Sequence, residues 1–357
     1  MPRVLFITTS YPSERDDCAG HFVRAEVNRA LADGHAVTVI APHAKRDAER
    51  ASVNDRPHFG AFGSPGALSR LRARPDRWLG ALIFVMTARS AARKFGPFDR
   101  TVAHFILPSL WPICALASGE VEVVVHGSDL RLLERLPRFV RERVLRTRPG
   151  VKQNYRCVST ELAGRLAKLF TNDDVPEICV APSPIEMPEL GSKTELRETL
   201  GIGPEKLVVI VARLISSKRV DVALRAAGAI DAKVVVCGDG PERQRLEREF
   251  PKVHFLGQVP RKRALEWMAA SDVVLSASLE EGAPTVVREA RALGVPVVTA
   301  DTGDVTSWAK RDTGIFVAAP EREALAQNLR SALGSSGSSD RYSAAAPAPA
   351  LRLGASG

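Results

Sequence analysis

The sequence predicts an α/β protein made of two doubly wound domains that face each other across a central cleft. Two observations lead to this expectation. Short apolar, β-branched runs alternate with helical segments along most of the 357 residues, and such alternation produces parallel sheets covered by helices on both faces. The alternation also starts twice, once on each side of a proline-rich stretch at 181–193. A proline-rich stretch between two periodic regions is typical of a linker, so we expect one domain on either side of it.

Each half contributes its own strands and helices. In the first half we expect strands at residues 4–8, 36–40, 101–105 and 121–125, and a helix from 21 that ends at Gly34. In the second half we expect strands at residues 206–212, 233–238, 253–257, 272–278, 296–300 and 314–318. Helical periodicity between these strands predicts helices at 218–230 and 241–250.

Composition sets the expected domain boundaries. These boundaries give a first domain at 1–185, a linker region at 186–205 and a second domain at 206–333. From residue 334 to 357 the chain is rich in Gly, Ser, Ala and Pro and has no apolar period. Such a segment cannot bury a core, so we expect it to be disordered.

The overall composition is that of a soluble globular protein, with 45% hydrophobic and 25% charged residues. The first ten residues resemble a buried strand rather than a signal peptide, and the most apolar run, 78–86, is too short to span a bilayer. The five cysteines include no CxxC pair, which favours reduced thiols over disulfides or a zinc site. We therefore expect a cytoplasmic protein.

The net charge of +9 is concentrated in the first half of the chain. Residues 131–148 hold seven arginines against two glutamates, a net charge of +5, interleaved with apolar residues at helical spacing. An ordinary amphipathic helix with a solvated face explains this pattern, and so does peripheral docking on an anionic membrane on its cytoplasmic side. Binding to nucleic acid is not expected, because no recognition motif accompanies the charge.

Two glutamates mark a candidate ligand site in the second half. Glu281 follows the strand expected at 272–278, and Glu289 lies on the helix expected after Pro284. In an open α/β sheet, ligands bind in the crevice beyond the carboxyl ends of the strands. Both carboxylates are therefore expected near that crevice.

Cations and glycines follow two other strands of the same sheet. Arg213 and Lys218 lie five residues apart on the loop after the strand at 206–212, where they could clamp a diphosphate or be ordinary surface cations. Gly238 and Gly240 form a turn after the strand at 233–238 and allow a close approach of backbone to a ligand. The turn lacks the G-x-G-x-x-G spacing of a dinucleotide site.

Taken together, these motifs resemble the retaining family-4 glycosyltransferases of GT-B fold. The resemblance rests on "ARLISSK", "CGDGPER", "FLGQV", "EGAPTVVREA" and "LGVPVV" in that order, and on the Glu-x7-Glu spacing of Glu281 and Glu289. In the first half, "VVVHGSDL" is similar to an HGxD-like motif and residues 11–40 to the N-terminal glycine loop and helix. The resemblance covers roughly residues 3–333 and implies two Rossmann-like domains that transfer sugar from a nucleotide-sugar donor. The implied acceptor is a glycan or lipid-linked molecule in cell-envelope or polysaccharide biosynthesis.

The resemblance also implies a role for each residue of the site. Glu289 would bind the ribose hydroxyls and Glu281 the transferred sugar. Arg213 and Lys218 would stabilise the leaving diphosphate, and His126 would contact the donor sugar near the reacting carbon. The remaining expected donor-binding residues are Gly20, Asp129, Gly238, Gly240, Gly282, Ala283, Pro284 and Thr285.

No metal or cofactor is expected beyond the nucleotide-sugar co-substrate. The aspartates include no Asp-x-Asp pair, and the histidines show no HxH or HExxH spacing. Three alternatives stay open, namely a GT-B epimerase, a phosphorylase and a degenerate sugar-binding protein. The last is motivated by the prolines in 340–357, which prevent the amphipathic helix that closes other GT-B chains.

Overall fold

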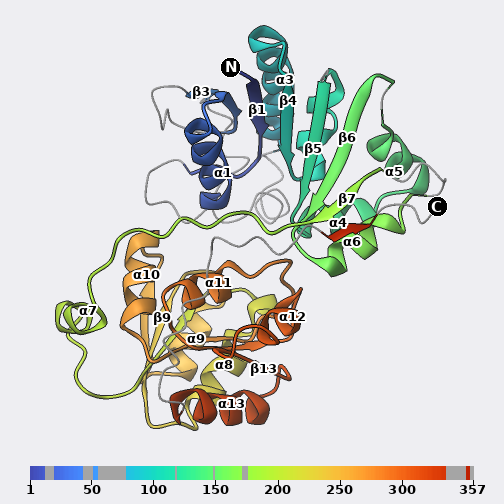
Figure 1. Ribbon diagram of the computed structural model, residues 1–357. Helices are drawn as coiled ribbons and strands as arrows, with labels where there is room; N and C mark the ends of the chain where they lie inside the picture. The colour runs from blue at the N-terminus through green and yellow to red at the C-terminus, as the bar shows by residue number, and fades with distance from the viewer. Residues whose placement is uncertain are drawn as a thin grey trace. The chain divides into compact units, whose positions relative to one another are not determined.

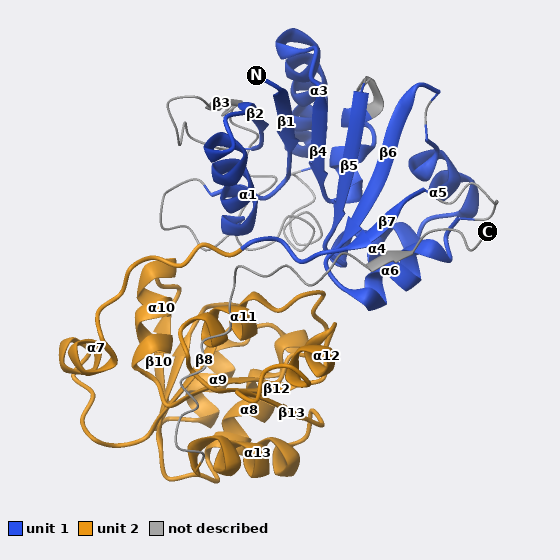
Figure 2. Cartoon of the chain, in the orientation of Figure 1, with its two compact units in different colours: residues 1–184, 347–357 blue, residues 185–346 orange. Residues whose placement is uncertain are grey.

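The computed structural model describes residues 1–12, 20–42, 51–54, 78–116, 119–147, 149–170, 176–334 and 351–353. The chain divides into two compact units (Figure 2), which we call unit 1 (Met1–Pro184 with Pro347–Gly357) and unit 2 (Ile185–Ala346). Each unit has its own parallel sheet with helices packed on it (Figure 1). The prediction of two doubly wound α/β domains is therefore confirmed.

Unit 1 contains an eight-stranded sheet in the order β14-β7-β6-β5-β4-β1-β2-β3. Its strands are β1 Arg3–Ile7, β2 Ala36–Ile40, β3 Ala51–Asn54, β4 Arg100–His104, β5 Gly119–Val125, β6 Val151–Cys157, β7 Ile178–Val180 and β14 Leu351–Leu353. Its helices are α1 His21–Ala32, α3 Trp78–Phe95, α4 Ser128–Glu134, α5 Arg138–Leu145 and α6 Thr160–Ala167, with short turns η2 Ile106–Leu110 and η3 Ile113–Leu116.

Unit 2 contains a six-stranded, fully parallel sheet in the order β10-β9-β8-β11-β12-β13. Its strands are β8 Leu207–Val211, β9 Lys233–Cys237, β10 His254–Gly257, β11 Val273–Ser276, β12 Val297–Ala300 and β13 Ile315–Ala318. Its helices are α7 Lys193–Thr199, α8 Val220–Ala227, α9 Arg243–Glu249, α10 Arg261–Ala270, α11 Thr285–Ala292, α12 Val305–Ala309 and α13 Arg322–Gly334, with the short turn η4 Ser216–Lys218.

Strand periodicity explains how the sheet of unit 2 is buried on both faces. Along β8, Val208 and Ile210 pack into one apolar cluster, whereas Leu207 and Val209 pack into the cluster on the opposite face. Side chains alternate across a strand, so a continuous apolar run serves both layers. The sheet order reverses between β8 and β11, and the loops that leave these two strands therefore flank a topological switch point, where ligands bind in such folds.

All ten strands expected from the sequence are present, and four others, β3, β6, β7 and β14, were not predicted. Strand β6 has the sequence VKQNYRC, and its four polar residues hide it from a search for apolar runs. It nevertheless lies between β5 and β7 in the middle of unit 1. Arg156 is compatible with that place because carboxylates from α1 and β5 pair with it.

The segment at 131–148 forms two helices rather than one. Pro137 precedes the first residue of α5 and separates it from α4, as its missing N–H requires. Leu133, Val144 and Leu145 are buried in the core of unit 1, whereas Phe139 is 73% exposed. Most of the apolar spacing thus reflects ordinary core packing.

The predicted linker and tail contain regular structure where they are described. Helix α7 lies within 186–205 and begins with a capping box in which Ser192 and Glu195 bond each other's backbone N–H. Leu351–Leu353 pair as an antiparallel strand with β7, so this part of the tail returns to the sheet of unit 1. The rest of the tail expected to be disordered lies outside the described residues. Among the helices that are described, none is long and apolar enough to cross a bilayer.

Candidate functional site

The switch point of unit 2 brings together two of the predicted catalytic residues. Lys218 ends the turn after β8, and Glu281 lies on the loop after β11. The Nζ atom of Lys218 forms an ion pair with Oε1 of Glu281, and Leu279 N–H donates to the carbonyl of Ser217 at 3.1 Å, which joins the two loops. The side chains are 15% and 26% exposed, so the pair lies at the surface of the site and a ligand can reach it.

Arg213 lies at the start of the same loop but does not join this pair. Its side chain is exposed, and it has no ion-pair partner in the part of the chain that the structure describes. Its carbonyl accepts from the N–H of Ile215 at 2.9 Å, which turns the backbone toward Lys218. The structure therefore places both cations on one loop but does not bring their side chains together.

The glycine turn after β9 packs directly on that loop. A Cβ at Gly238 would lie 1.8 Å from the carbonyl oxygen of Ala212, and a Cβ at Gly240 would lie 2.3 Å from that of Leu214. The N–H of Leu214 also donates to the carbonyl of Asp239 at 2.9 Å. Both glycines are thus required for the contact between two loops, which fixes the segment that carries Arg213. Close approach to a ligand, their predicted role, stays a prediction.

The predicted Gly-Ala-Pro turn leads into α11. Pro284 is the N-cap residue and Thr285 begins the helix, so Gly282 and Ala283 occupy the loop immediately before its positive end. The carbonyl of Gly282 lies 2.0 Å from the position of a Cβ on Gly303, and the loop is therefore packed against the segment after β12. A helix N-terminus held in this way suits phosphate or sugar oxygens.

Glu289 is the fifth of the eight residues of α11 and is only 6% exposed. Arg261, the first residue of α10, donates to its Oε1 from Nε at 3.1 Å and from Nη2 at 2.7 Å. Arg261 also donates to the carbonyl of Glu186 at 2.7 Å, which ties the segment after unit 1 to this carboxylate. The sequence analysis missed Arg261. A signal existed, because "PRKR" places three cations at a helix N-terminus, where the dipole disfavours them.

In unit 1, Asp129 holds the backbone around His126. Its Oδ1 accepts from the N–H groups of His126 at 3.1 Å and Gly127 at 2.9 Å, and its Oδ2 accepts from Ile106 at 3.0 Å. Burial raises the pKa of the Asp129 carboxyl, although these backbone donors oppose the rise. Because three backbone groups already occupy its oxygens, Asp129 acts in this structure by positioning His126.

His126 follows β5 and is enclosed by rings. The ring centroids of Phe22, Phe105 and His104 lie 4.8, 4.6 and 5.3 Å from its own. Its Nε2 lies 3.1 Å from Nδ1 of His104. Burial, and then the neighbouring His104, hold the pKa of His126 well below its usual value, so the ring is neutral at neutral pH.

A buried network of charges lies beneath His126, and the sequence analysis missed all of it. Arg156 on β6 donates at 2.5 Å to Glu26 of α1 and at 2.5 Å to Glu122 of β5. Glu122 also pairs with Arg100 on β4. Burial alone would raise the pKa of the Glu26 carboxyl, but Arg156 and His104 outweigh burial and lower it. Four elements of unit 1 are thus joined by charge.

Gly20, the N-cap residue of α1, has φ +72° and lies against the first strand's loop. A Cβ there would lie 2.4 Å from the carbonyl oxygen of Ser10, so the glycine is needed for backbone packing. The loop from 13 to 19, to which its predicted ligand contact refers, lies outside the described residues. Within the described ranges, no group of three or more His, Cys, Asp or Glu side chains is arranged to hold a metal ion. Metal independence stays a prediction.

Comparison with known proteins identifies a domain in the second half of the chain and relatives along most of its length. Residues 192–348 match the family described as glycosyl transferases group 1. TuaC of Bacillus subtilis strain 168, named as a teichuronic acid biosynthesis glycosyltransferase, is 28% identical over 358 residues, covering 92% of this chain and 88% of that protein. A D-inositol 3-phosphate glycosyltransferase of Xylanimonas cellulosilytica is 29% identical over 216 residues, covering 54% of this chain and 52% of that protein.

Solved structures show the same fold along nearly the whole chain. Sucrose-phosphate synthase of Thermosynechococcus elongatus has a TM-score of 0.76 at 15% identity, covering 94% of this chain and 90% of that chain. Anabaena Alr3699/HepE in complex with UDP-glucose has a TM-score of 0.66 at 17% identity, covering 93% and 90%. The chain therefore has the GT-B fold, and residues 192–348 form a domain of the glycosyl transferases group 1 family.

Proposed function

We propose that this protein is a retaining glycosyltransferase that moves a sugar from a nucleotide-diphosphate sugar to a glycan or lipid-linked acceptor. The observation that carries the proposal is the Lys218–Glu281 ion pair at the switch point of unit 2. A cation and a carboxylate held together there suit the two parts of a sugar diphosphate. The cation can bind the anionic diphosphate, and the carboxylate can accept hydrogen bonds from the hydroxyls of the sugar. The names of TuaC and of the inositol phosphate enzyme support the sugar chemistry, and the complexes of HepE with UDP and with UDP-glucose support the donor class.

Binding of the donor would rearrange the ion pair. Its diphosphate would attract Lys218 and the exposed Arg213, and Glu281 would then be free to accept hydrogen bonds from the hydroxyls of the transferred sugar. Glu289 would accept from the ribose hydroxyls while Arg261 keeps its carboxylate oriented. The N–H groups at the start of α11, from Gly282 to Thr285, would complete the binding of phosphate and sugar oxygens.

Catalysis would depend on charge that is already in place. As the bond to the anomeric carbon breaks, negative charge grows on the leaving diphosphate, and preorganised cations lower the barrier to that step. No separate nucleophile is needed if the acceptor attacks from the same face and the departing phosphate helps to accept its proton. Lys218 and Arg213 would then supply the electrostatic stabilisation that a metal ion supplies elsewhere. His126 of unit 1 would contact the donor sugar near the reacting carbon.

The acceptor side would lie at an anionic membrane in this proposal. Phe139 is exposed among the arginines of α5, and helix α3 also exposes Trp78, Leu79, Leu82 and Met86. Exposed apolar side chains beside a basic segment are typical of peripheral membrane binding. A lipid-linked acceptor in cell-envelope polysaccharide synthesis, the process that the name of TuaC suggests, would be met at that surface.

A panel of UDP-, GDP-, ADP- and TDP-sugars in a thermal-shift assay tests the donor class first. One nucleotide should raise the melting temperature in a concentration-dependent way, because a ligand that binds only the native state stabilises it. The selected donor is then incubated with and without acceptor glycans, in Mg²⁺ and in EDTA, and the anomeric configuration of the product is read by NMR. Transfer that persists in EDTA with retained configuration supports the proposal. A chain that binds no nucleotide-sugar and transfers no sugar would exclude it.

A further inference from the structure

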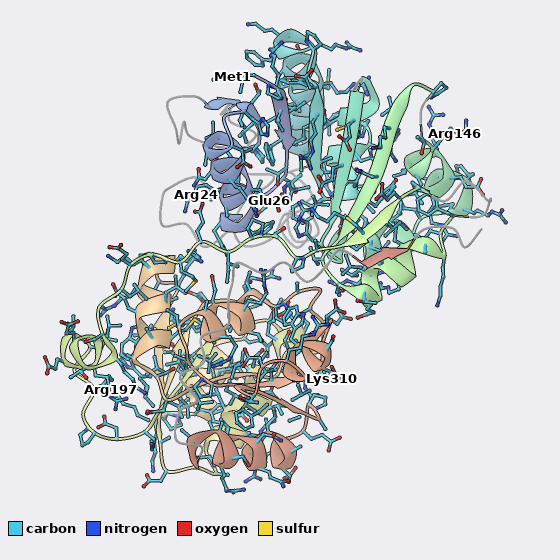
Figure 3. The ribbon with its side chains drawn as sticks, in the orientation of Figure 1. Met1, Arg24, Glu26, Arg146, Arg197 and Lys310 are labelled. Atoms are coloured by element: carbon cyan, nitrogen blue, oxygen red, sulfur yellow. The ribbon has the colours of Figure 1, made fainter. Side chains whose placement is uncertain are left out.

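Three side chains of unit 1 form a continuous line behind His126. Nε2 of His126 lies 3.1 Å from Nδ1 of His104, and Nε2 of His104 lies 3.5 Å from Oε2 of Glu26. Figure 3 labels Glu26 on α1, while the two histidines end β4 and follow β5. His104 is fully buried, so this line runs from a half-buried ring into the interior of the unit.

The inventory of donors and acceptors fixes the tautomers of the two rings. An ionised carboxylate can only accept, and the pKa of Glu26 is lowered. Its Oε2 lies 3.5 Å from Nε2 of His104, too far for a regular hydrogen bond, but close enough for its charge to favour the tautomer of His104 with the hydrogen on Nε2. In neutral His104, Nδ1 is then an acceptor, and it must receive the hydrogen of Nε2 of His126. Neutral His126 is left with a lone pair on Nδ1, which has no hydrogen-bond partner among the described residues.

One added proton reverses the polarity of that free nitrogen. If a proton binds Nδ1 of His126, the hydrogen on its Nε2 can pass to Nδ1 of His104, and no bond other than these N–H bonds changes. The charge then rests on His104 beside Glu26, whereas His126 stays neutral, as its lowered pKa favours. The charged and titratable groups that surround this line are Glu26 from α1, Glu122 from β5, Arg156 from β6 and Asp129 from α4. Of these, Arg156 opposes the added charge and the carboxylates favour it.

We propose that His104, backed by Glu26, is a positioning residue that sets the tautomer of His126 and stores one proton behind it. With the line neutral, Nδ1 of His126 accepts a hydrogen bond from a sugar hydroxyl. With one proton added, the same atom donates. This inference rests on the proposed function only in naming a sugar hydroxyl as the partner; the tautomers and the proton follow from the three side chains themselves.

Ordinary core packing is the competing explanation for His104. Its ring lies 6.3 Å from the ring of Phe6 and 6.1 Å from that of Phe22, measured between centroids, and a buried ring between two phenylalanines fills space whatever its protonation. A purely structural His104 would leave the tautomer of His126 unspecified and would not link the two titrations. The two explanations therefore predict different tautomers and different titration behaviour for His126 and His104, whereas a measurement of stability alone does not distinguish them.

The first test needs no substrate. The full chain is labelled with ¹⁵N-histidine, and long-range ¹H–¹⁵N spectra are recorded from about pH 5 to 9, with His104→Asn and His126→Asn variants to assign the rings. We expect His126 to carry its hydrogen on Nε2 at neutral pH and to exchange it to Nδ1 in the same step in which His104 becomes charged. We call this linked transfer of a proton between His126 and His104 the relay. An Nδ1–H tautomer of His126 at neutral pH, or independent titration of the two rings, would overturn the relay.

The second test uses two matched substitutions. In His104→Asn the new amide can lie near the former Nδ1 position and keep a contact with His126. In His104→Gln the amide can reach Glu26 but no longer contacts His126. Neither side chain titrates. We expect both variants to lose the acid-side inflection in the pH profile of kcat. We also expect kcat to fall by about 10- to 100-fold, by analogy with the loss of the group that orients a metal-ligating histidine. Wild-type pH profiles in both variants would overturn the relay.

Glu122→Gln serves as the control. It also removes a carboxylate from Arg156, and within the described part of the chain Glu122 forms its ion pairs with Arg100 and Arg156 and none with His104. The inflection should therefore remain, whereas Glu26→Gln should shift it to lower pH. If the 104 variants do not fold, the spectra of the wild-type chain still decide the question. Failure of the proposed function, with no sugar transfer from any donor, would leave the linked titration in place. Failure of the relay would instead show as sugar transfer without any linked titration.

Discussion

The two units place charge differently at the carboxyl ends of their strands. In unit 2, Lys218 and Glu281 lie on loops at the switch point and remain partly exposed. In unit 1, Glu26 and Arg156 are buried beneath the loops, and His126 is separated from them by a second histidine. A ligand can compete for Lys218 and Glu281 directly, whereas it can interact with the buried pair of Glu26 and Arg156 only through His126. Under the proposed function, unit 2 would supply charge to the reaction, and the buried groups of unit 1 would hold His126 in position.

The energetic consequences differ in the same way. Two partly exposed charges contribute little to folding, because water and salt screen them. A buried pair has lost its hydration, so removal of one partner leaves the other uncompensated. Substitutions in unit 1 should therefore act first on stability, and those in unit 2 first on rate and affinity. The following predictions test that division.

Glu26→Gln should have the largest effect, a loss of about 3–5 kcal/mol in the free energy of unfolding of unit 1. The pKa of Glu26 is lowered in the folded state by Arg156 and His104, against the rise that burial alone would give. Its contribution is thus complete above its unfolded pKa of about 4.3 and is lost as pH falls toward the folded value. The difference from wild type should consequently be large at pH 7 and should shrink in acid. Urea unfolding followed by hydrogen exchange and mass spectrometry resolves the two units.

Glu161→Gln is a matched control, because its i,i+4 pair with Arg165 is exposed and should contribute no more than about 1 kcal/mol. For Asp129 the dependence of stability on pH has the opposite sign to that of Glu26, because burial raises the pKa of its carboxyl and protonation therefore favours the folded state. Equal losses for Glu26→Gln and Glu161→Gln, or a loss that unit 2 shares, would contradict the division between the units.

Lys218→Ala should lower kcat on the order of 100-fold or more, because a preorganised cation is lost where charge develops. Arg213→Ala should act in the same direction, although its side chain has to move before it meets the diphosphate. Lys193→Ala is the matched control. It removes a lysine–carboxylate pair with Asp272 at the opposite end of β11, and turnover should be unchanged. A Lys218→Ala enzyme with full kcat and only a raised KM would show uniform binding instead.

Glu289→Ala should weaken binding of the nucleotide diphosphate by about 1.5–3 kcal/mol, the range for hydrogen bonds to a charged group. Among the described residues, the substitution leaves Arg261 with the carbonyl of Glu186 as its one remaining partner. Glu289→Gln can keep one hydrogen bond and should therefore lose less affinity. Glu266→Ala on α10 removes the partner of Arg263 and should not change affinity. Calorimetry with the free nucleotide diphosphate measures each variant. Unchanged affinity in Glu289→Ala would remove this residue from the ribose site.

The same division explains how much could be predicted from sequence. The strands of unit 2 are apolar runs and its candidate site residues lie in short contiguous motifs, so Lys218, Glu281 and the turn before Thr285 can be predicted from the sequence. The site of unit 1 is assembled from α1, β4, β5 and β6, which are far apart in sequence. Arg156 could not be predicted because β6 has too many polar residues to be recognised as a strand. The pairing of Arg156 becomes visible only once α1 and β5 are packed against β6, where Glu26 and Glu122 meet its guanidinium.

The smallest expected effect concerns the surface of unit 1. Each basic side chain near an anionic membrane contributes about 1 kcal/mol, so Arg146→Gln should lower the vesicle partition coefficient by about 5-fold. Arg146 is labelled in Figure 3 at the end of α5 and is exposed. Phe139→Ala should weaken binding as well, because its exposed ring is apolar.

Arg330→Gln makes the same charge change on α13 of unit 2 and is the control for net charge. Co-sedimentation with vesicles that contain anionic lipid, at low and at high salt, distinguishes a local surface from a general cationic effect, because salt screens exposed charges within a Debye length of about 10 Å at 0.1 M. Equal losses for Arg146→Gln and Arg330→Gln would indicate nonspecific attraction. Absence of any binding to anionic vesicles at low salt would leave α5 with a structural role alone, since Val144 and Leu145 already anchor it in the core.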